Sequence, residues 1–252
     1  MGRNIPVTGV LGGGASSSVT GWAGRARLRP GGVLYGGAIG SATAHAHHSV
    51  QVIAALGGDE LLMAGPGGEP LRCRAYVVPA GVRHSVLGGV PRGVVLHYDP
   101  LSVAGRRLAA LAGDAGDLVP DVLPADPFEA ACALDSVLPR GPLPCADPHP
   151  GLVRVLDWLP GREHVRLSQA AEVACLSESR LAHLFRSELG LPFRPYVLWM
   201  RLMHAVELAS RGHSLTDAAH GAGFADGAHF SRVWRRMFGI APSDFTRTVQ
   251  WM

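Results

Sequence analysis

The feature that most restricts the fold of this chain is an internal repeat in its C-terminal part. Two segments, 178–189 and 227–238, carry apolar residues at i, i+3, i+4 and i+8, and a glycine follows each. This spacing is typical of a helix with one buried face. The matched residues lie a constant 49 positions apart: Leu181, Leu184, Phe185, Leu189 and Gly190 against Phe230, Val233, Trp234, Phe238 and Gly239. The sequence therefore predicts two copies of one helical unit.

Each repeated helix follows a shorter helical segment and a tight turn. Ser177 and Asp226 stand at the N-cap positions, where a side-chain oxygen accepts a hydrogen bond from the first turn of a helix. Gly221-Ala222-Gly223 supplies the second turn, and Cys175 lies in the first. A long helix from about Phe193 to Ser210 separates the copies. Two helices joined by a tight turn form a helix-turn-helix, so the sequence predicts two of them.

The outer faces of the repeated helices carry hydrogen-bond donors and cations. Arginine can donate two hydrogen bonds to guanine, which contributes about 1–3 kcal/mol of discrimination between bases. The alternative is that these arginines form an ordinary solvated helix face. Two copies in register favour nucleic-acid binding over that alternative.

The segment from Leu167 to about Arg247 resembles the DNA-binding domain of AraC/XylS-type bacterial transcriptional regulators. The stretches that carry the resemblance are Leu176 to Phe185, Glu188-Leu189-Gly190, Arg201-Leu202, Gly221 to Asp226, His229 to Arg236 and Phe238 to Phe245. The resemblance implies two helix-turn-helix units on one side of the duplex. Successive major-groove segments on one side recur every ~34 Å, so the helix between the units would set their spacing.

The resemblance also assigns residues to the DNA. Positions that approach base edges in the family correspond to Ser179, Arg180, His183, Gly227, Ala228, His229 and Arg232. Three further arginines, Arg186, Arg235 and Arg236, are expected to contact phosphates.

The N-terminal part has a different pattern, because 25 of the 33 glycines fall in residues 1–146. Short apolar runs closed by Gly and Pro favour a β-sandwich or small barrel. The predicted strands are 33–38, 49–56, 61–64, 76–78 and 94–98. Alanine-rich helical segments follow at 103–111 and 128–138, and 139–150 contains five prolines. We expect a β-barrel domain at 1–100, linking helices and a linker at 101–150, and the DNA-binding domain at 151–252.

Four residues of the N-terminal part could form a metal site. In an extended strand His45 and His47 point to one face about 7 Å apart, whereas Gln51 lies about 13 Å beyond His47. One ion could bind all three only if the chain bends near residues 48–50. The spacing His45-x-His47-x3-Gln51, followed by Pro79-x-Gly81-x2-His84, resembles the two motifs of the cupin β-barrel.

Metal-binding cupins have three histidines and a carboxylate at these positions. Here Gln51 replaces the carboxylate, and Gly88 stands where the second motif usually has asparagine. The resemblance makes His45, His47 and His84, with Gln51 as fourth ligand, a candidate metal site, which would suit Zn, Ni, Fe or Mn. The alternatives are that these histidines line a small-ligand pocket or pack inside the barrel. His97 is expected to be a core or rim residue.

Composition excludes several classes. Hydrophobic residues at 47% and charged residues at 17% of the 252 residues exclude a disordered chain or a coiled coil. The net charge is only +3, and every basic residue other than histidine is arginine. The four cysteines lack the spacing of a disulfide framework or a zinc ribbon. No apolar stretch approaches the roughly 18 residues of a membrane span, so we expect a cytoplasmic protein.

These observations predict a non-enzymatic, sequence-specific transcriptional regulator whose cupin-like domain senses a small molecule or a metal. Promoter DNA, the effector and a second copy of the chain, joined through helices between 103 and 138, are the expected partners. RNA polymerase is a further candidate. The alternative is a metal-dependent cupin enzyme, a dioxygenase or isomerase, with a helical assembly domain. A structural adaptor would need apolar outer faces on helices 178–189 and 227–238, where the sequence has cations.

Overall fold

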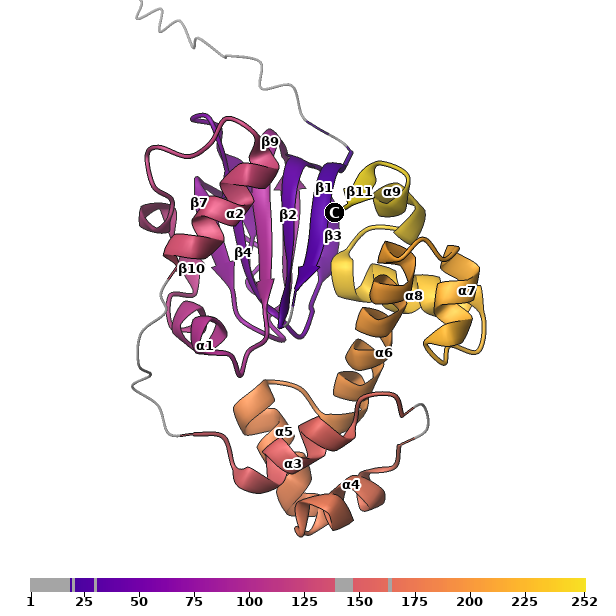
Figure 1. Cartoon of the computed structure of the whole chain (residues 1–252). Coiled ribbons are helices and arrows are strands. Elements are labelled where there is room, and N and C mark those ends of the chain that lie inside the picture. Colours follow the sequence, from indigo (N-terminus) through magenta and orange to yellow (C-terminus); the bar gives the residue numbers. More distant parts are fainter. Residues whose placement is uncertain (1–18, 20, 30, 139–146, 163–164) are drawn as a thin grey trace, which may run out of the picture.

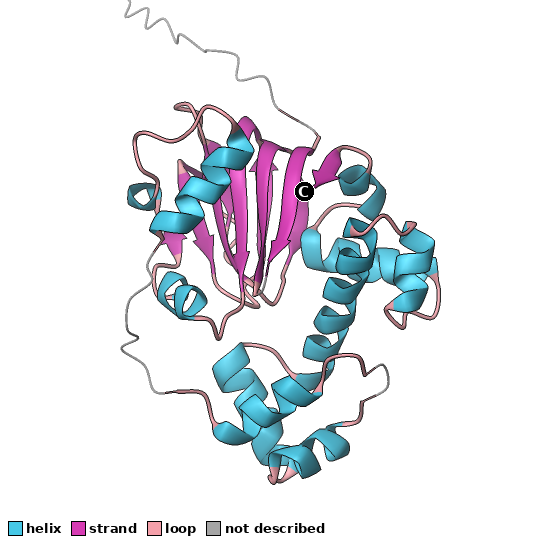
Figure 2. Cartoon of the chain, in the orientation of Figure 1, coloured by secondary structure: helices cyan, strands magenta, loops and turns pink. Residues whose placement is uncertain are grey.

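The computed structural model describes residues 19, 21–29, 31–138, 147–162 and 165–252. A sheet-rich N-terminal half and a helical C-terminal half confirm the predicted fold class (Figures 1 and 2). Most of the predicted proline-rich linker, residues 139–146, lies outside the described residues.

The larger sheet joins strands from both ends of the chain. Within the described residues it has seven strands, antiparallel except that the last two are parallel. In spatial order they are β10 (Gly113–Asp114), β7 (Ala75–Val78), β4 (Val50–Ala55), β9 (Val90–Tyr98), β2 (Gly32–Ile39), β1 (Ala23–Arg29) and β11 (Val249–Trp251).

The smaller sheet packs against the larger one. It is antiparallel, with the order β3 (Ala42–His45), β8 (His84–Gly88), β5 (Leu61–Ala64) and β6 (Pro70–Cys73). Side chains from both sheets, among them Tyr35, Ile53, Met63 and Val86, form one buried cluster between them. This is the sandwich or barrel class that the short apolar runs predict.

Two helices and a 3-10 turn cover the other face of the larger sheet. They are α1 (Val103–Ala109), η1 (Gly116–Leu118) and α2 (Pro127–Val137). Ala130, Ala131 and Leu134 of α2 pack in one cluster with Val52 and Leu96 of the sheet. Strand β4 is buried on both faces for this reason. Helix α2, a predicted dimerisation element, therefore uses its apolar face within its own chain.

The first helical unit consists of α3 (Pro150–Trp158), α4 (Leu167–Ala174) and α5 (Glu178–Leu189). Its core contains the apolar stripe predicted for residues 178–189, and Leu181 and Phe185 are fully buried. Helix α6 (Phe193–Ser210) leaves this core, where it buries Phe193 and Tyr196, and enters the next, where it buries Leu202 and Val206.

The second helical unit consists of α7 (Leu215–Gly221), α8 (Gly227–Phe238) and α9 (Pro242–Thr246). Phe230, Val233 and Trp234 are buried as the repeat predicts. Phe238 differs from its counterpart in the first unit, because it is only half-buried and lines a cavity, and Met237 is buried in its place. Figure 1 shows the two units at opposite ends of α6.

Strand β11 ties the second unit to the larger sheet. It pairs with β1 from Gly24↔Val249 to Ala26↔Trp251. Val249 is buried in the cluster between the sheets, and Trp251 packs on its edge. The chain therefore returns to the N-terminal sheet after the helical half, which the sequence did not predict.

Candidate nucleic-acid interface and metal centre

Helices α5 and α8 have the same local construction. The Ser177 hydroxyl accepts a hydrogen bond from the Arg180 N–H at 3.2 Å, and the Asp226 carboxylate accepts one from the His229 N–H at 2.6 Å. Each helix ends at a left-handed glycine, with φ 72° at Gly190 and 71° at Gly239. Such a residue terminates a helix with little strain only when it has no Cβ. The sequence fixes both ends of both helices in this way.

The residues predicted to contact DNA lie on the outer faces of the two helices. Nine of the ten are exposed: Ser179, Arg180, His183, Arg186, Gly227, Ala228, Arg232, Arg235 and Arg236. His229 is half-buried because its ring packs edge-on against Phe224, with the centroids 5.4 Å apart. Neither helix has its polar face in the core.

The arginines of these faces are not held in ion pairs within the described part of the chain. Five guanidinium groups are therefore available to an anionic partner: Arg180, Arg186, Arg232, Arg235 and Arg236. A surface of this kind suits the phosphates and guanine edges of a duplex.

Helix α6 sets the separation of the two units. Its 18 residues span about 27 Å at 1.5 Å per residue. This length is of the same order as the ~34 Å between successive major-groove segments on one side of DNA.

The turn of the first unit contains the one non-glycine residue with positive φ among the described residues. Cys175 has φ 54° and ψ 44° at the C-cap of α4. The left-handed region favours glycine, so this turn carries some backbone strain. A Cβ in the left-handed region costs roughly 1–2 kcal/mol. The thiol is exposed.

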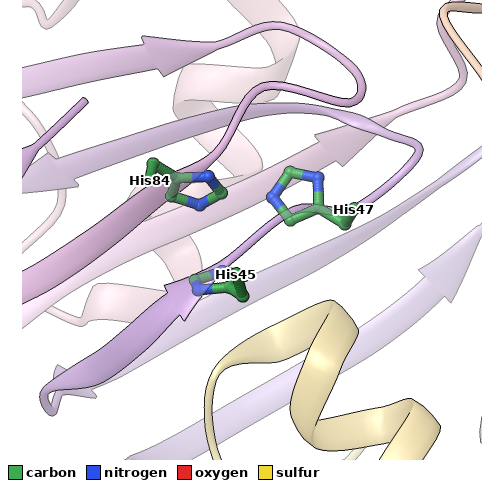
Figure 3. A group of neighbouring side chains, drawn as sticks. All are labelled: His45, His47 and His84. Atoms are coloured by element: carbon green, nitrogen blue, oxygen red, sulfur yellow. The ribbon is translucent and has the colours of Figure 1, made fainter. Parts of the chain in front are cut away.

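The structure brings His45, His47 and His84 together inside the barrel, and all three are buried (Figure 3). Their possible ligand nitrogens lie within 4.8 Å of one another. His45 ends β3, and His84 begins the adjacent β8, where the two residues are register partners. His47 comes from the segment that leads into β4.

Three backbone carbonyls fix the orientation of these rings. The Nδ1 atoms of His45, His47 and His84 lie 2.7, 2.9 and 3.0 Å from the carbonyl oxygens of Thr43, Ser49 and Val82. A carbonyl can only accept, so each Nδ1 carries the proton and each Nε2 keeps its lone pair. Such a hydrogen bond is the usual support of a metal-bound histidine. His84 Nε2 is buried and has no hydrogen-bond partner among the described residues.

Gln51 reaches the same site because the chain bends at residues 48–49. The bend replaces the straight strand that would have kept Gln51 far from His47, and Gln51 Oε1 lies 2.6 Å from His47 Nε2. With the proton on His47 Nδ1, both His47 Nε2 and Gln51 Oε1 are hydrogen-bond acceptors. At this separation they must share a cation, or the Gln51 amide must be rotated so that its NH2 group faces His47. The four residues therefore fit a divalent transition metal with three imidazole ligands and one amide oxygen.

Burial keeps these imidazoles neutral. Desolvation lowers the pKa of His84 to about 2, and it holds the pKa of His47 well below its usual value. Neighbouring histidines lower both further, and burial also lowers the pKa of His45. Neutral imidazole is the form that binds metal.

Two further buried or half-buried histidines lie near the site. His97, predicted as a core or rim residue, lies 2.7 Å from the Ser49 hydroxyl, and its ring centroid is 4.9 Å from that of His47. The ring of His48 packs edge-on against Tyr196 and lies near Trp199 of α6. Periodicity gave no signal for either contact, since both depend on where the helices pack.

A cavity of about 1050 Å³ lies between the barrel and the helical half. His45, Gln51 and His97 line it from the barrel, and Trp199 and Phe238 line it from the helices. Among the described residues, three that line the cavity carry buried N–H donors with no hydrogen-bond partner: the Nε atoms of Arg29 and Arg201 and the indole Nε1 of Trp234. The buried Nδ1 atom of His48 also has none. The cavity gives a small molecule contact with both halves of the chain.

A family model described as a helix-turn-helix domain matches residues 170–248. The arabinose operon regulatory protein of Salmonella typhimurium is 35% identical over 83 residues, which cover 32% of this chain and 30% of that protein. The transcriptional activator RhaS of Yersinia pestis is 31% identical over 96 residues, which cover 37% of this chain and 35% of RhaS. The chain thus spans about a third of the length of these curated regulators.

The two-domain arrangement also has a solved counterpart. The structure of ToxT from Vibrio cholerae matches with a TM-score of 0.55 and 12% identity, over 86% of this chain and 98% of ToxT. At this identity the likeness concerns the fold alone. Among the described residues no helix combines the length and apolar character needed to cross a membrane.

Proposed function

We propose that this protein is a sequence-specific DNA-binding transcriptional regulator of the AraC type, because residues 170–248 match a helix-turn-helix family model and are similar to the arabinose operon regulatory protein. The observation that carries the proposal is the exposure of two capped helices, 49 positions apart, with unpaired arginines on their outer faces. Ser179, Arg180, His183, Gly227, Ala228, His229 and Arg232 would approach base edges. Arg186, Arg235 and Arg236 would contact phosphates.

The N-terminal barrel is the sensor in this proposal. Its effector is a divalent transition metal at His45, His47, His84 and Gln51, or a small molecule in the adjoining cavity. Three lone pairs directed by carbonyl hydrogen bonds, together with the unpartnered His84 Nε2, support the metal. In this proposal the regulator binds promoter DNA as a homodimer. RNA polymerase is a further proposed partner.

Selection of duplexes from a random pool tests the DNA-binding half. We expect the purified chain to enrich a common sequence with two half-sites, and the affinity to fall steeply with salt because phosphate contacts release counterions. Metal analysis of the same preparation tests the sensor, with one metal per chain expected. A preparation that enriches no duplex at low salt overturns the proposal, and turnover by such a preparation would favour the cupin enzyme.

A further inference from the structure

The C-terminal cap of helix α8 rests on the strand that carries His45. The Gly239 carbonyl accepts hydrogen bonds from the Thr43 backbone N–H at 3.0 Å and from the Thr43 hydroxyl at 2.9 Å. A Cβ built at Gly239 would overlap the Thr43 carbonyl oxygen and lie 2.6 Å from His45 Nδ1. Figure 3 shows the yellow ribbon of the C-terminal part close to His45. Only glycine allows this approach.

Thr43 bonds to the cap and to the histidine site at the same time. Its carbonyl oxygen accepts the hydrogen bond from His45 Nδ1 at 2.7 Å. Its N–H and hydroxyl donate to the Gly239 carbonyl. Any displacement of the His45 ring is therefore transmitted to the end of α8 through one residue.

Metal binding would displace that ring. Metal–nitrogen bonds of ~2.0–2.1 Å in a tetrahedral site place ligand nitrogens roughly 3.3–3.4 Å apart. The nitrogens of the three histidines now lie at separations of up to 4.8 Å. Metal binding therefore draws the three histidine nitrogens together and restricts the motion of the segment that carries Thr43.

The first helical unit contacts a different part of the barrel. The Gly190 carbonyl that ends α5 lies 3.0 Å from a Cβ built at Gly81, in the loop that leads to His84. The ring of His48 packs on Tyr196 of α6. Since both units rest on the barrel, the docking of the α8 cap fixes where α8 lies relative to α5.

We propose that metal binding at His45, His47 and His84 is coupled to DNA binding through the contact of Thr43 with Gly239, and that loading strengthens both. The inference rests on the proposed function and adds its route of regulation. Coupling of this kind requires that the metal bind the docked and undocked states unequally, and it is reciprocal.

Amide exchange tests the contact without DNA. Zinc added to the full chain is expected to slow exchange of the Thr43 N–H, which donates to Gly239. In Gly239→Ala the new Cβ prevents docking, so zinc should leave that amide unchanged. Gly212→Ala is the matched control, because Gly212 also has positive φ, +92°, but nothing lies within 4 Å of its Cβ position. Equal protection of Thr43 with and without zinc in the wild-type protein overturns the proposal.

Thr43→Val provides a second variant of similar shape. It removes the hydroxyl donor to Gly239 and leaves the carbonyl that orients His45. Thr246→Val is its control, since the Thr246 hydroxyl donates within α9 to Pro242.

Anisotropy with a duplex recovered from the random pool measures the effect on DNA binding. We expect zinc to tighten wild-type binding by about fivefold or more, Thr43→Val to lose most of this effect, and Thr246→Val to keep it. A wild-type protein that binds zinc and duplex independently overturns this inference and leaves the proposed function standing. Failure to recover any duplex overturns the proposed function instead, and the amide exchange then still decides whether zinc and the cap are linked.

Discussion

Cys175 carries a backbone conformation that suits glycine. We expect Cys175→Gly to raise the free energy of unfolding by about 0.5–1 kcal/mol, because relief of the left-handed strain exceeds the extra backbone entropy that glycine loses on folding. Urea unfolding measures the change. Cys175→Ala is the matched control, since it removes the thiol and keeps the Cβ. If both variants have the same stability, strain at this turn is absent.

The buried histidines should make stability depend on pH. Their pKa values in the folded protein lie below the value of 6.5 expected in the unfolded chain, about 2 for His84 and about 3 for His97. Above pH 6.5 neither state binds these protons. As the pH falls below 6.5 the unfolded state binds them and the folded state does not, so stability is lost.

We expect this loss to be about 1.4 kcal/mol per pH unit for each such histidine in metal-free protein. Denaturant unfolding between pH 6.5 and 5 measures the slope. His84→Gln should reduce the slope by the share of one histidine. An unchanged slope in His84→Gln would show that His84 is already protonated in the folded state.

The sequence predicted that His45, His47 and His84 form the histidine site. For Gln51 it predicted only that a bend in the chain near residues 48–50 would be needed. Strand geometry placed Gln51 too far from His47 unless the chain bent, and the bend at residues 48–49 depends on the change from one sheet to the other. The roles of His97 and Thr43 could not be predicted, because their partners are distant in sequence and are placed by packing.

Helix α8 presents two arginines that should affect DNA binding in different ways. Arg235→Ala, by loss of a phosphate contact, should weaken binding to all duplexes alike and reduce the salt dependence by about one ion. Arg232→Ala should lower discrimination at one base position by about 1–3 kcal/mol. Selection from a random pool with each variant measures both effects.

Arg211→Ala is the control for these two variants, because Arg211 is exposed at the end of α6 and pairs with Glu207. It should leave affinity and selectivity unchanged. If Arg232→Ala keeps its full selectivity, the assignment of Arg232 to a base edge is wrong.

Helices were predicted more closely than strands. The bounds of α5, α6 and α8 agree with the predicted ranges. For α5 and α8 the period, the N-cap and the terminal glycine all indicate the same residues. Five strands were also found near their predicted positions. Strands β1, β3, β6, β8, β10 and β11 were not predicted, since most of them are short and have little periodic signal.

At the scale of the molecule, β11 makes the stability of the two halves interdependent. Val249 is buried between the sheets, whereas Gln250, next to it on the same strand, is exposed. We expect Val249→Asp to lower the free energy of unfolding by about 2–4 kcal/mol, because a carboxylate would be buried without a partner. Gln250→Asp should change it by less than about 0.5 kcal/mol. Thermal unfolding of the two variants checks this, and equal stability would show that β11 does not pack in solution.

The parallel pairing of β11 with β1 also sets an order of events during synthesis. A ribosome makes residues 30–248 between these two strands, so every helix of the DNA-binding half has been translated before β1 receives its outer neighbour. Until then β1 presents an unpaired edge to other nascent chains, and exposed edges of this kind promote aggregation. A chain released before residue 249 would keep that edge.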